Sequence, residues 1–304
     1  MIRYIQRHEI HDELWDSCIR NAINSLPYAY SWYLDSAAGN WDALVWGNYE
    51  KVFPLVWRKR FFISYLYQPY FTQQLGVFSA DSPDAETVRA FLQAIPAHFR
   101  FMEIHLNYRN PVEEDGYTVE KRTNLCLNLN RPYVEIAQAY HENTRRNVKK
   151  AEKNNLQLKS GLSAEIIIEF FKANTGVKIP ELGEFHYEHL EKIIREATVR
   201  NMGQTYGVFD NRENLLSAGF FLETPDRVIN LLPSVEEGAK ELGAGFFLID
   251  SLIRKYAASG KILDFEGSMH PQIARFYNSF GAYEQPYWRV RLNRLPRWMK
   301  WIKR

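Results

Sequence analysis

The chain has 304 residues, a length that suits one large domain or two domains of about 150 residues each. Hydrophobic residues make up 46% of it and aromatic residues 15%, which is ample for packed cores and excludes long disordered regions. The formal net charge is only +2, so any affinity for nucleic acid or membranes has to come from local clusters of charge.

The cysteines and the N-terminal segment indicate the cellular compartment in which the protein is expected. Cys18 and Cys126 form neither a CxxC pair nor a disulfide framework, which fits a reducing cytosol and buried, inert thiols. The segment MIRYIQRHEIHDE carries charges where a signal peptide has an apolar run, and no apolar stretch approaches the roughly 20 residues of a membrane-spanning helix. We therefore expect a soluble, cytoplasmic protein.

The first half opens with a predicted strand over 3–6 and a helix over 12–22. Its inward residues are expected to be Leu14, Cys18 and Ile19. An aromatic stretch follows, and we favour core packing over a substrate groove for Tyr28, Tyr30, Trp32 and Tyr33. Apolar runs separated by polar or basic turns then predict an antiparallel meander over 43–46, 52–57 and 61–67.

The segment QPYFTQQLGVFS, residues 68–79, predicts a strand with two polar residues in its middle. Adjacent strand residues face opposite ways, so only one of Gln73 and Gln74 can line a pocket while the other is paired or solvated. Ser82 is expected to cap a helix over 83–96. Two further strands are predicted over 101–106 and 123–129.

The segment 132–155 is predicted to form one basic helix that connects the two halves. Like charges four residues apart destabilise a helix by a few tenths of a kcal/mol per pair, which an anionic ligand would offset. One interpretation is a solvated linker helix; the other is a surface for the phosphates of a nucleotide-linked substrate or an RNA acceptor stem. The residues concerned are Arg145, Arg146, Asn147, Lys149, Lys150 and Lys153, with Glu152 as the only acidic companion of these cations.

After Gly161 the pattern of the first half returns. Helices are predicted over 164–173 and 185–201, and strands over 205–209, 215–222 and 227–235. Both halves therefore read as helices, a three-strand meander, a helix and another strand, which predicts two copies of one fold. The expected boundaries are an N-terminal domain over 1–131, the connecting helix over 132–155 and a C-terminal domain over 156–304.

The stretch 236–281 comes directly after the predicted strand over 227–235. It begins with a Gly-rich turn, and a helix follows that turn. Gly238, Gly243 and Gly245 let the backbone turn tightly and leave amides unpaired at the start of the helix, where the macrodipole favours an anion such as a pyrophosphate. The buried stripe of that helix recurs at three- and four-residue spacing in Phe246, Ile249, Leu252, Ile253 and Tyr256.

A short strand over 261–265 comes next, with Asp264 and Glu266 at its exit. On a regular strand these two carboxylates face the same side, since they are two residues apart. A second helix is expected from Pro271 to Gly281, with proline at its start and glycine just past its end. The chain then ends in the cation-rich segment PYWRVRLNRLPRWMKWIKR, whose Trp298 and Trp301 would either seat it on an anionic membrane surface or pack on the body of the protein.

The Gly-rich turn, the strand after it and the sequence ARFYNSFGA together resemble the acyl-transfer core of the GNAT superfamily. There the turn holds pyrophosphate and the later helix ends in a Tyr-x-x-x-Gly pattern, here Tyr277 to Gly281. Two such units in tandem, with RRNVKKAEK between them, LDFEGS in the second and QPYFTQQLGVFS in the first, resemble the Fem family of aminoacyl-tRNA-dependent peptidyltransferases and their FemAB-like relatives. The resemblance implies an α/β (mixed α+β) class with two tandem GNAT-like domains, each a mixed, largely antiparallel sheet flanked by helices.

The identity of the acyl donor is left open between aminoacyl-tRNA and acyl-CoA. No tightly bound cofactor is expected. Some Fem peptidyltransferases insert a charged helical hairpin in the second half, and this chain has none. The turn ELGAG also lacks the basic form usual in coenzyme A-binding GNAT proteins, and Lys240 is the nearest cation. The resemblance places the donor at Lys240, Gly243, Ala244 and Gly245, and an acceptor or phosphate at Gln73, Gln74, Arg145, Arg146, Asn147 and Lys149.

Amine acylation needs a neutral amine, a polarised carbonyl and a proton for the leaving group. Asp264 or Glu266 is placed to take the amine proton, the alternative for Asp264 being a pair with a nearby cation or amide. Tyr277 matches the position where GNAT enzymes often keep a tyrosine that protonates the leaving group. An oxyanion would be held by free amides around 243–246 or by strand amides that a bulge leaves unpaired. No metal site is predicted, because His186 and His189 lack supporting ligands.

Two classes of function follow. The first is an N-acyltransferase, dependent on aminoacyl-tRNA or acyl-CoA, that acts on an amine of a cell-envelope precursor such as a peptidoglycan building block; an acyl-CoA-dependent N-acetyltransferase is its variant. The second is a non-catalytic GNAT-like module that binds RNA or a phosphate-bearing precursor. Expected partners are a phosphate-bearing small molecule or lipid-linked precursor, tRNA, and the inner membrane surface through the basic C-terminus.

Overall fold

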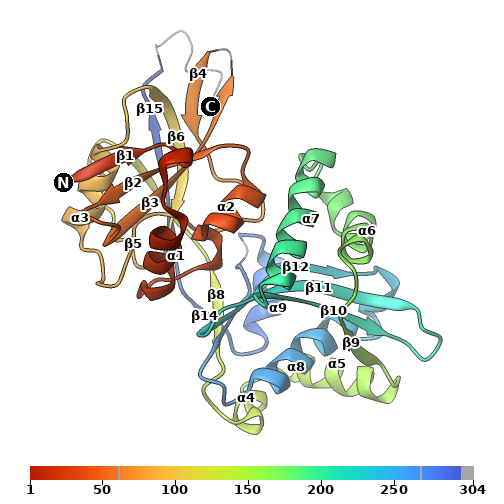
Figure 1. Ribbon diagram of the computed structural model, residues 1–304. Coiled ribbons are helices and arrows are strands. Elements are labelled where there is room, and N and C mark those ends of the chain that lie inside the picture. The colour runs from red at the N-terminus through yellow and green to blue at the C-terminus, as the bar shows by residue number, and fades with distance from the viewer. Residues whose placement is uncertain (61, 268, 296–304) are drawn as a thin grey trace. The chain divides into compact units, whose positions relative to one another are not determined.

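The computed structural model describes residues 1–60, 62–267 and 269–295, and the chain folds into two units (Figure 1). The first unit is Met1–Arg122 together with the segment that begins at Pro286, and the second is Thr123–Gln285. Each unit has a mixed, largely antiparallel sheet flanked by helices, as the sequence predicted. In the described part of the chain, no helix has both the length and the apolar character needed to cross a membrane.

The sheet of the first unit has the order β1-β2-β3-β4-β6-β15-β7, with β5 paired to β3. Neighbouring strands are antiparallel except β4 and β6, which are parallel. The predicted meander is confirmed as β2, β3 and β4. The strands are β1 Ile2–Ile5, β2 Trp41–Trp46, β3 Lys51–Arg60, β4 Ile63–Leu66, β5 Phe78–Ser79, β6 Phe99–Leu106, β7 Thr118–Arg122 and β15 Tyr287–Asn293.

The helices of the first unit differ in detail from the prediction. They are α1 Asp12–Asn21, α2 Ser31–Ala37 and α3 Ala85–Gln93. In α1 the buried residues are Trp15 and Ile19, whereas Leu14 is exposed. The prediction that Leu14 faces inward is therefore wrong, and the neighbouring Trp15 takes the buried position. The cap of α3 is Asp84 rather than Ser82, because the Asp84 carboxylate accepts a hydrogen bond from the backbone N–H of Thr87 at 2.7 Å.

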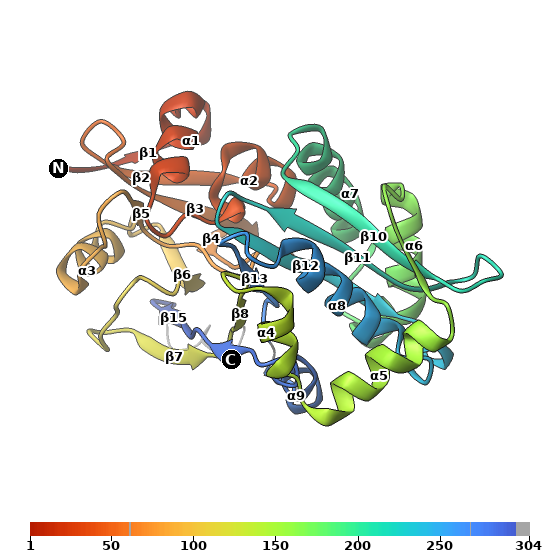
Figure 2. The ribbon, with the colours of Figure 1, turned by 90° about the horizontal axis from the view of Figure 1, so that it is seen from below.

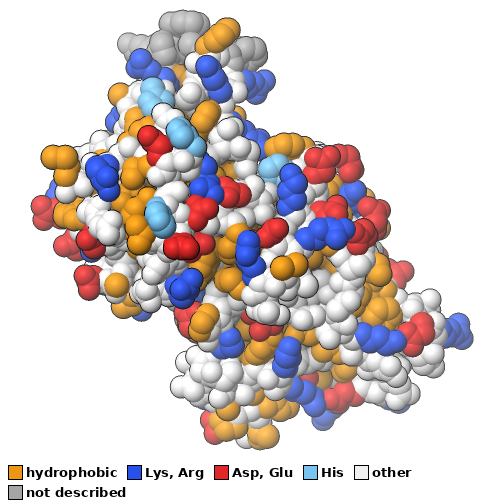
Figure 3. Space-filling model, viewed as in Figure 1, with side chains coloured by type: hydrophobic (Ala, Val, Ile, Leu, Met, Phe, Trp, Pro, Cys, Tyr) orange, Lys and Arg blue, Asp and Glu red, His pale blue; other side chains and the backbone are white. Residues whose placement is uncertain are grey.

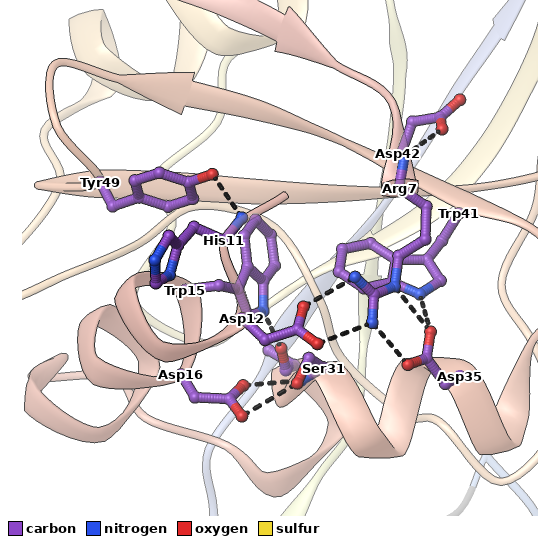
Figure 4. A network of polar contacts seen from close by, with 11 residues as sticks. Arg7, His11, Asp12, Trp15, Asp16, Ser31, Asp35, Trp41, Asp42 and Tyr49 are labelled. Carbon is purple, nitrogen blue, oxygen red and sulfur yellow. Dashed lines mark hydrogen bonds and ion pairs between the residues drawn. The ribbon is translucent and has the colours of Figure 1, made fainter. Parts of the chain in front are cut away.

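Core packing of the early aromatic residues is confirmed, since Tyr28 and Tyr33 are buried and their rings meet edge to face. A polar network fastens α1 and α2 to β2 (Figure 4). At its centre the Arg7 guanidinium binds Asp12 and Asp35 at 2.7 Å each and lies over the Trp41 ring.

The sheet of the second unit has the order β14-β8-β13-β12-β11-β10-β9, in which only the β12–β13 pair is parallel. On one face lie α6 and α7, and on the other α5 and α8 (Figure 1). The strands are β8 Leu125–Asn128, β9 Gln157–Ser160, β10 Gly203–Phe209, β11 Leu215–Glu223, β12 Arg227–Val235, β13 Ile262–Asp264 and β14 Tyr283–Glu284. The helices are α4 Tyr133–Gln138, α5 Glu142–Lys153, α6 Ala164–Asn174, α7 Glu184–Val199, α8 Ala244–Tyr256 and α9 Pro271–Asn278.

The predicted single helix over 132–155 is instead two helices, α4 and α5. The chain breaks between them because the backbone N–H of His141 donates to the carbonyl of Ser279 at 2.9 Å, outside any helical pattern. α5 is also no linker: it lies alongside α8 (Figure 2), and its Val148 and Ala151 are buried. The solvated-linker interpretation is therefore wrong for one face of this helix, while its cations do face solvent.

The unit boundaries also differ from the expected division at 131 and 156. β8, assigned by sequence to the N-terminal domain, pairs with β13 and β14 of the second unit. β15, assigned to the C-terminal domain, pairs with β6 and β7 of the first unit. Strand pairing between residues far apart in sequence thus sets the division, which local composition does not reveal.

Candidate functional site

The turn before α8 has the geometry that the glycines predict. Gly243 adopts φ +80°, in the left-handed region, and caps the helix. The N–H of Phe247 reaches the Gly243 carbonyl at 2.9 Å, but the N–H groups of Ala244, Gly245 and Phe246 have no partner among the described residues. Three donors therefore remain at the positive end of a thirteen-residue helix, where an anion is favoured.

Helix α5 packs directly on this turn. A Cβ added to Gly243 would lie 2.5 Å from the backbone oxygen of Asn147 on α5. The structure thus brings together two predicted binding segments, the Gly-rich turn and the basic helix. Lys240, the cation nearest the turn, is paired with the Glu237 carboxylate at 2.7 Å.

Gly243→Ala should therefore lower the free energy of unfolding by at least about 2 kcal/mol, because the left-handed conformation alone costs an L-residue about 1–2 kcal/mol and the new Cβ also meets Asn147. Gly238→Ala in the same turn is the matched control, since nothing lies within 4 Å of its added Cβ. Urea denaturation of both variants checks this. Equal stability of the two would contradict the close packing of α5 on the turn.

The parallel strands β12 and β13 stay paired for only a short distance. Their register runs from Arg227 opposite Ile262 to Ile229 opposite Asp264, after which β13 ends. β12 continues to Val235 beside β11, with a bulge that leaves Leu231 as the extra residue between Asn230 and Leu232. The β12 edge from Asn230 onward thus has no β13 partner, next to the turn that leads into α8.

Asn230 and Tyr277 meet at this place. The Asn230 Nδ2 donates a hydrogen bond to the Tyr277 hydroxyl oxygen at 3.1 Å. Asn230 is 1% exposed and Tyr277 4%, and the Tyr277 ring stacks on Phe265 with centroids 4.4 Å apart. Burial and then the negative charge of Glu266 raise the pKa of the Tyr277 phenol, while the hydrogen bond from Asn230 lowers it. The phenol is therefore held neutral, the form that can donate a proton.

The other polar atom of Asn230 is unsatisfied. Its Oδ1 is buried and has no hydrogen-bond partner among the described residues. A buried acceptor left unpaired costs about 1–3 kcal/mol, so such atoms are rare in folded proteins. Sequence analysis missed Asn230, because a single asparagine in the apolar run RVINLLPSV carries no spacing signal of its own.

Asp264 is used by a buried ion pair. Its Oδ2 lies 2.6 Å from Nη1 of Arg227, and both side chains are 1% exposed. Its Oδ1 accepts the backbone N–H of Glu266 at 2.8 Å. Asp264 thus pairs with a nearby cation and a backbone amide, as one of the two sequence-based interpretations expected. Its role as a general base stays a prediction.

Glu266 does not continue the strand as expected. It has φ +53°, because β13 has already ended at Asp264 and the chain turns toward Gly267. The two carboxylates therefore do not share a strand face: Asp264 is buried in its ion pair, while Glu266 is half-buried, with its charge acting on the phenol of Tyr277. Of the two carboxylates, Glu266 is the more exposed, and its role as a base stays a prediction.

A hollow of about 370 Å³ lies beside the start of α8. Its walls include Phe246 of α8, Arg275 and Phe276 of α9, and His141 and Asn143 at the start of α5. The Phe246 and Phe276 rings are 4.8 Å apart, and Phe276 also contacts Tyr277 at 5.2 Å. This volume and mixture of aromatic and polar walls suit a small-molecule group.

The basic face of α5 lies next to this hollow in the fold. Arg145 donates to the carbonyl of Gln138 at 3.3 Å and Arg146 to Asn143 at 2.9 Å, and neither guanidinium pairs with a carboxylate of the described residues. Asn147 binds back to Asn143 through its Nδ2. Lys149 is exposed. Phosphate contact by these residues stays a prediction.

The glutamines of the first unit are not on a strand. Residues 68–77 are irregular, and only Phe78–Ser79 forms β5. Gln74 is buried, with its Oε1 accepting the backbone N–H of Tyr108 at 2.9 Å and its Nε2 donating to Gln73. Gln74 therefore holds the loop together, which leaves Gln73 as the more exposed of the two predicted binding residues.

The first unit has a second hollow, of about 410 Å³, beside Asp35, Trp41 and Trp57.

The remaining predicted residues lie elsewhere. His186 accepts the backbone N–H of Gly183 at 3.0 Å and so caps α7. Trp298 and Trp301, on which the membrane-contact prediction rests, lie outside the described residues. On the face seen in Figure 3, charges of both signs are interspersed, in keeping with the small net charge.

No family model and no curated protein sequence matches this chain. Solved structures do match over almost its whole length. FemX aligns with a TM-score of 0.68 at 11% identity, covering 94% of this chain and 96% of that one. A tandem GNAT protein from the clavulanic acid biosynthesis pathway aligns with a TM-score of 0.55 at 12% identity, covering 97% and 99%. L-PGS from Bacillus licheniformis aligns with a TM-score of 0.54 at 10% identity, covering 96% and 94%.

At these identities the matches establish the fold and nothing more. The chain has a FemAB-like, tandem GNAT-type fold, which confirms the prediction from its motifs. These matches carry no activity, donor or acceptor over to this chain.

Proposed function

We propose that this protein is an N-acyltransferase that moves an aminoacyl or acyl group from a phosphate-bearing donor to an amine. The observation that carries the proposal is the Tyr277 hydroxyl, held by Asn230 at the point where β12 and β13 part. The resemblance to GNAT enzymes gives a tyrosine at this position the role of proton donor to the leaving group. The free amides at the start of α8 and the neighbouring hollow would hold the donor.

The reaction divides among this chain's own residues. The neutral amine attacks the donor's carbonyl carbon and forms the C–N bond, while the C–S or C–O bond to the leaving group breaks. The leaving atom takes its proton from Tyr277, and the nitrogen loses its extra proton to Glu266, directly or through water. A proton returned from Glu266 to Tyr277 by solvent restores both groups, so no atom is unaccounted for.

The acceptor that we propose is an amine on a cell-envelope precursor, with a peptidoglycan precursor as the first candidate. The resemblance to the Fem peptidyltransferases and the fold shared with FemX support it. Aminoacyl-tRNA and acyl-CoA are the two proposed donors; both carry phosphates for the α8 turn and an adenosine for the hollow. An acyl-CoA-dependent N-acetyltransferase is thus the variant of the same proposal.

Thermal-shift titration with acetyl-CoA, aminoacyl-tRNA and a nucleotide-linked peptidoglycan precursor tests the proposal. A ligand that binds only the folded chain stabilises it by about 2.7 kcal/mol at one hundred times its Kd, which raises the Tm. A shift followed by transfer to an amine supports an acyltransferase and identifies the donor. No shift and no transfer with any of the three would overturn it.

Charge on α5 gives a second test. Changing Arg145, Arg146 and Lys149 together to glutamine should weaken tRNA or nucleotide binding and reduce the slope of log Kd against log salt by about 0.7–0.9 for each phosphate that the variant no longer neutralises. Lys192→Gln with Arg212→Gln is the control, because both side chains are exposed and lie elsewhere on the second unit. An unchanged salt slope in the triple variant would show that α5 binds no phosphate.

A non-catalytic binding module is the second candidate. The observations that favour it are the burial of Tyr277 at 4% exposure and the occupation of Asp264 by Arg227. It predicts that the tRNA or precursor binds as tightly to a Tyr277→Phe variant as to the natural chain and is never modified.

A further inference from the structure

The side chain of Asn230 has one polar group that is hydrogen-bonded and one that is not. Its Nδ2 donates to Tyr277 at 3.1 Å, whereas its buried Oδ1 has no partner among the described residues. The flanking Ile229 and Leu231 are buried apolar residues, so the position lies in the core of β12. An apolar residue would pack there without an unsatisfied acceptor. An asparagine that served only to anchor Tyr277 would leave this acceptor unexplained.

The position of the acceptor relates it to the chemistry. Asn230 is the first β12 residue beyond the last β12–β13 pair, Ile229 with Asp264. It binds the same hydroxyl whose pKa responds to the charge of Glu266. Because Tyr277 accepts the hydrogen bond from Asn230, its own hydroxyl hydrogen remains available for donation to a leaving group.

We propose that the Asn230 Oδ1 binds one N–H of the attacking amine, and that this makes the protein selective for amines over alcohols. This rests on the proposed acyl transfer. A neutral primary amine carries two hydrogens, one to donate to Oδ1 while its lone pair attacks and one to lose once the C–N bond has formed. An alcohol carries a single O–H hydrogen, which it must give up, so its attack leaves Oδ1 unpaired. Asn230 is thus the residue that specifies the acceptor class.

The full-length protein with methoxyamine as the amine and methanol as the alcohol tests this, using acetyl-CoA and alanyl-tRNA as donors. Asn230→Leu keeps a similar volume and removes both polar groups, and Asn230→Asp keeps an acceptor oxygen. Asn278→Leu, at an exposed position of α9, is the control. The readouts are kcat and KM for each substrate, with the Tm of every variant.

We expect Asn230→Leu to lower kcat/KM for methoxyamine by about 10- to 100-fold, mainly through a higher amine KM, with the donor KM unchanged. The Tm of this variant shows whether the fold is kept, because the change removes both the unpaired acceptor and the hydrogen bond to the buried Tyr277 hydroxyl. Asn230→Asp should retain more amine transfer than Asn230→Leu, and the natural chain should acylate methoxyamine but not methanol.

Several results would overturn the inference. Unchanged amine kinetics in Asn230→Leu would show that Oδ1 does not bind the amine. A raised donor KM with an unchanged amine KM would mean that the side chain holds the acyl carbonyl instead. Equal transfer to methanol would remove the selectivity while leaving acyl transfer intact. Failure of the natural chain to acylate methoxyamine from either donor, above the uncatalysed rate, would overturn the proposed function and this inference with it.

Discussion

Replacing Asp264 by asparagine is expected to lower the free energy of unfolding of the second unit by about 3–5 kcal/mol, since the change leaves the Arg227 guanidinium buried without its counter-charge. Both side chains are 1% exposed, so water cannot compensate. Both members of the pair also make further hydrogen bonds: Arg227 donates to the Gln285 Oε1 at 3.1 Å, and Asp264 accepts the backbone N–H of Glu266.

The distribution of tryptophan allows this destabilisation to be assigned to one unit. All eight tryptophans of the chain lie outside residues 123–285. Urea unfolding followed by tryptophan fluorescence therefore reports the first unit, whereas far-ultraviolet circular dichroism reports both. We expect Asp264→Asn to shift the dichroism transition and leave the fluorescence transition in place.

Two controls sharpen this prediction. Joint replacement of Arg227 by methionine and Asp264 by leucine should recover most of the stability, because two apolar residues of similar volume leave no buried charge. Glu196→Gln breaks an exposed pair with Arg200 and should change stability by at most about 1 kcal/mol. If Asp264→Asn proved as mild as Glu196→Gln, the ion pair would not be a structural element, and Asp264 would return as a candidate base.

Tyr277→Phe is expected to lower kcat for acyl transfer by about 100-fold or more, the usual contribution of a positioned general acid. The KM for the donor should stay the same, because the change removes only the phenol hydroxyl, whereas the groups proposed to bind phosphates are the backbone amides at the start of α8. Donors with more acidic leaving groups should be less sensitive to the change, since they leave without a proton. Rates measured with a series of thioesters of differing thiol pKa check this.

The pH dependence follows from the same phenol. Burial and the charge of Glu266 raise its pKa above the ordinary value of about 10, so Tyr277 stays protonated throughout the neutral range. Any decrease in rate through ionisation of Tyr277 should therefore begin only above pH 10. An alkaline fall in kcat near pH 8 that disappears in Tyr277→Phe would contradict this environment.

Tyr256→Phe is the matched control for Tyr277→Phe. Tyr256 is also buried in the second unit, and its hydroxyl donates to the Glu223 carboxylate, so the variant removes a comparable hydrogen bond. We expect it to be less stable but to keep its kcat. An equal reduction of kcat in both variants would assign the effect to the fold of the unit rather than to proton donation.

Local patterns in the sequence determined much of the second unit. The three- and four-residue spacing from Phe246 to Tyr256 predicted α8, and the glycines predicted the tight turn before it, where Gly243 proves to be left-handed. Both features depend on residues close together in the chain. Tyr277 could be placed on its helix for the same reason. The segment 132–155 failed as a single helix because Tyr140 binds Asp250 and His141 binds Ser279, more than one hundred residues away.

Only the tertiary structure decided which residues meet. Asp264 finds its counter-charge in Arg227 through the parallel register of β12 and β13, and Asn230 reaches Tyr277 across 47 positions of sequence. β15 likewise joins the first sheet by pairing with β6 and β7. Backbone conformation and periodicity arise from neighbours within a few residues, so a sequence displays them. Charge pairing, burial and an unsatisfied acceptor arise from strand register and packing between distant segments, which no local pattern encodes.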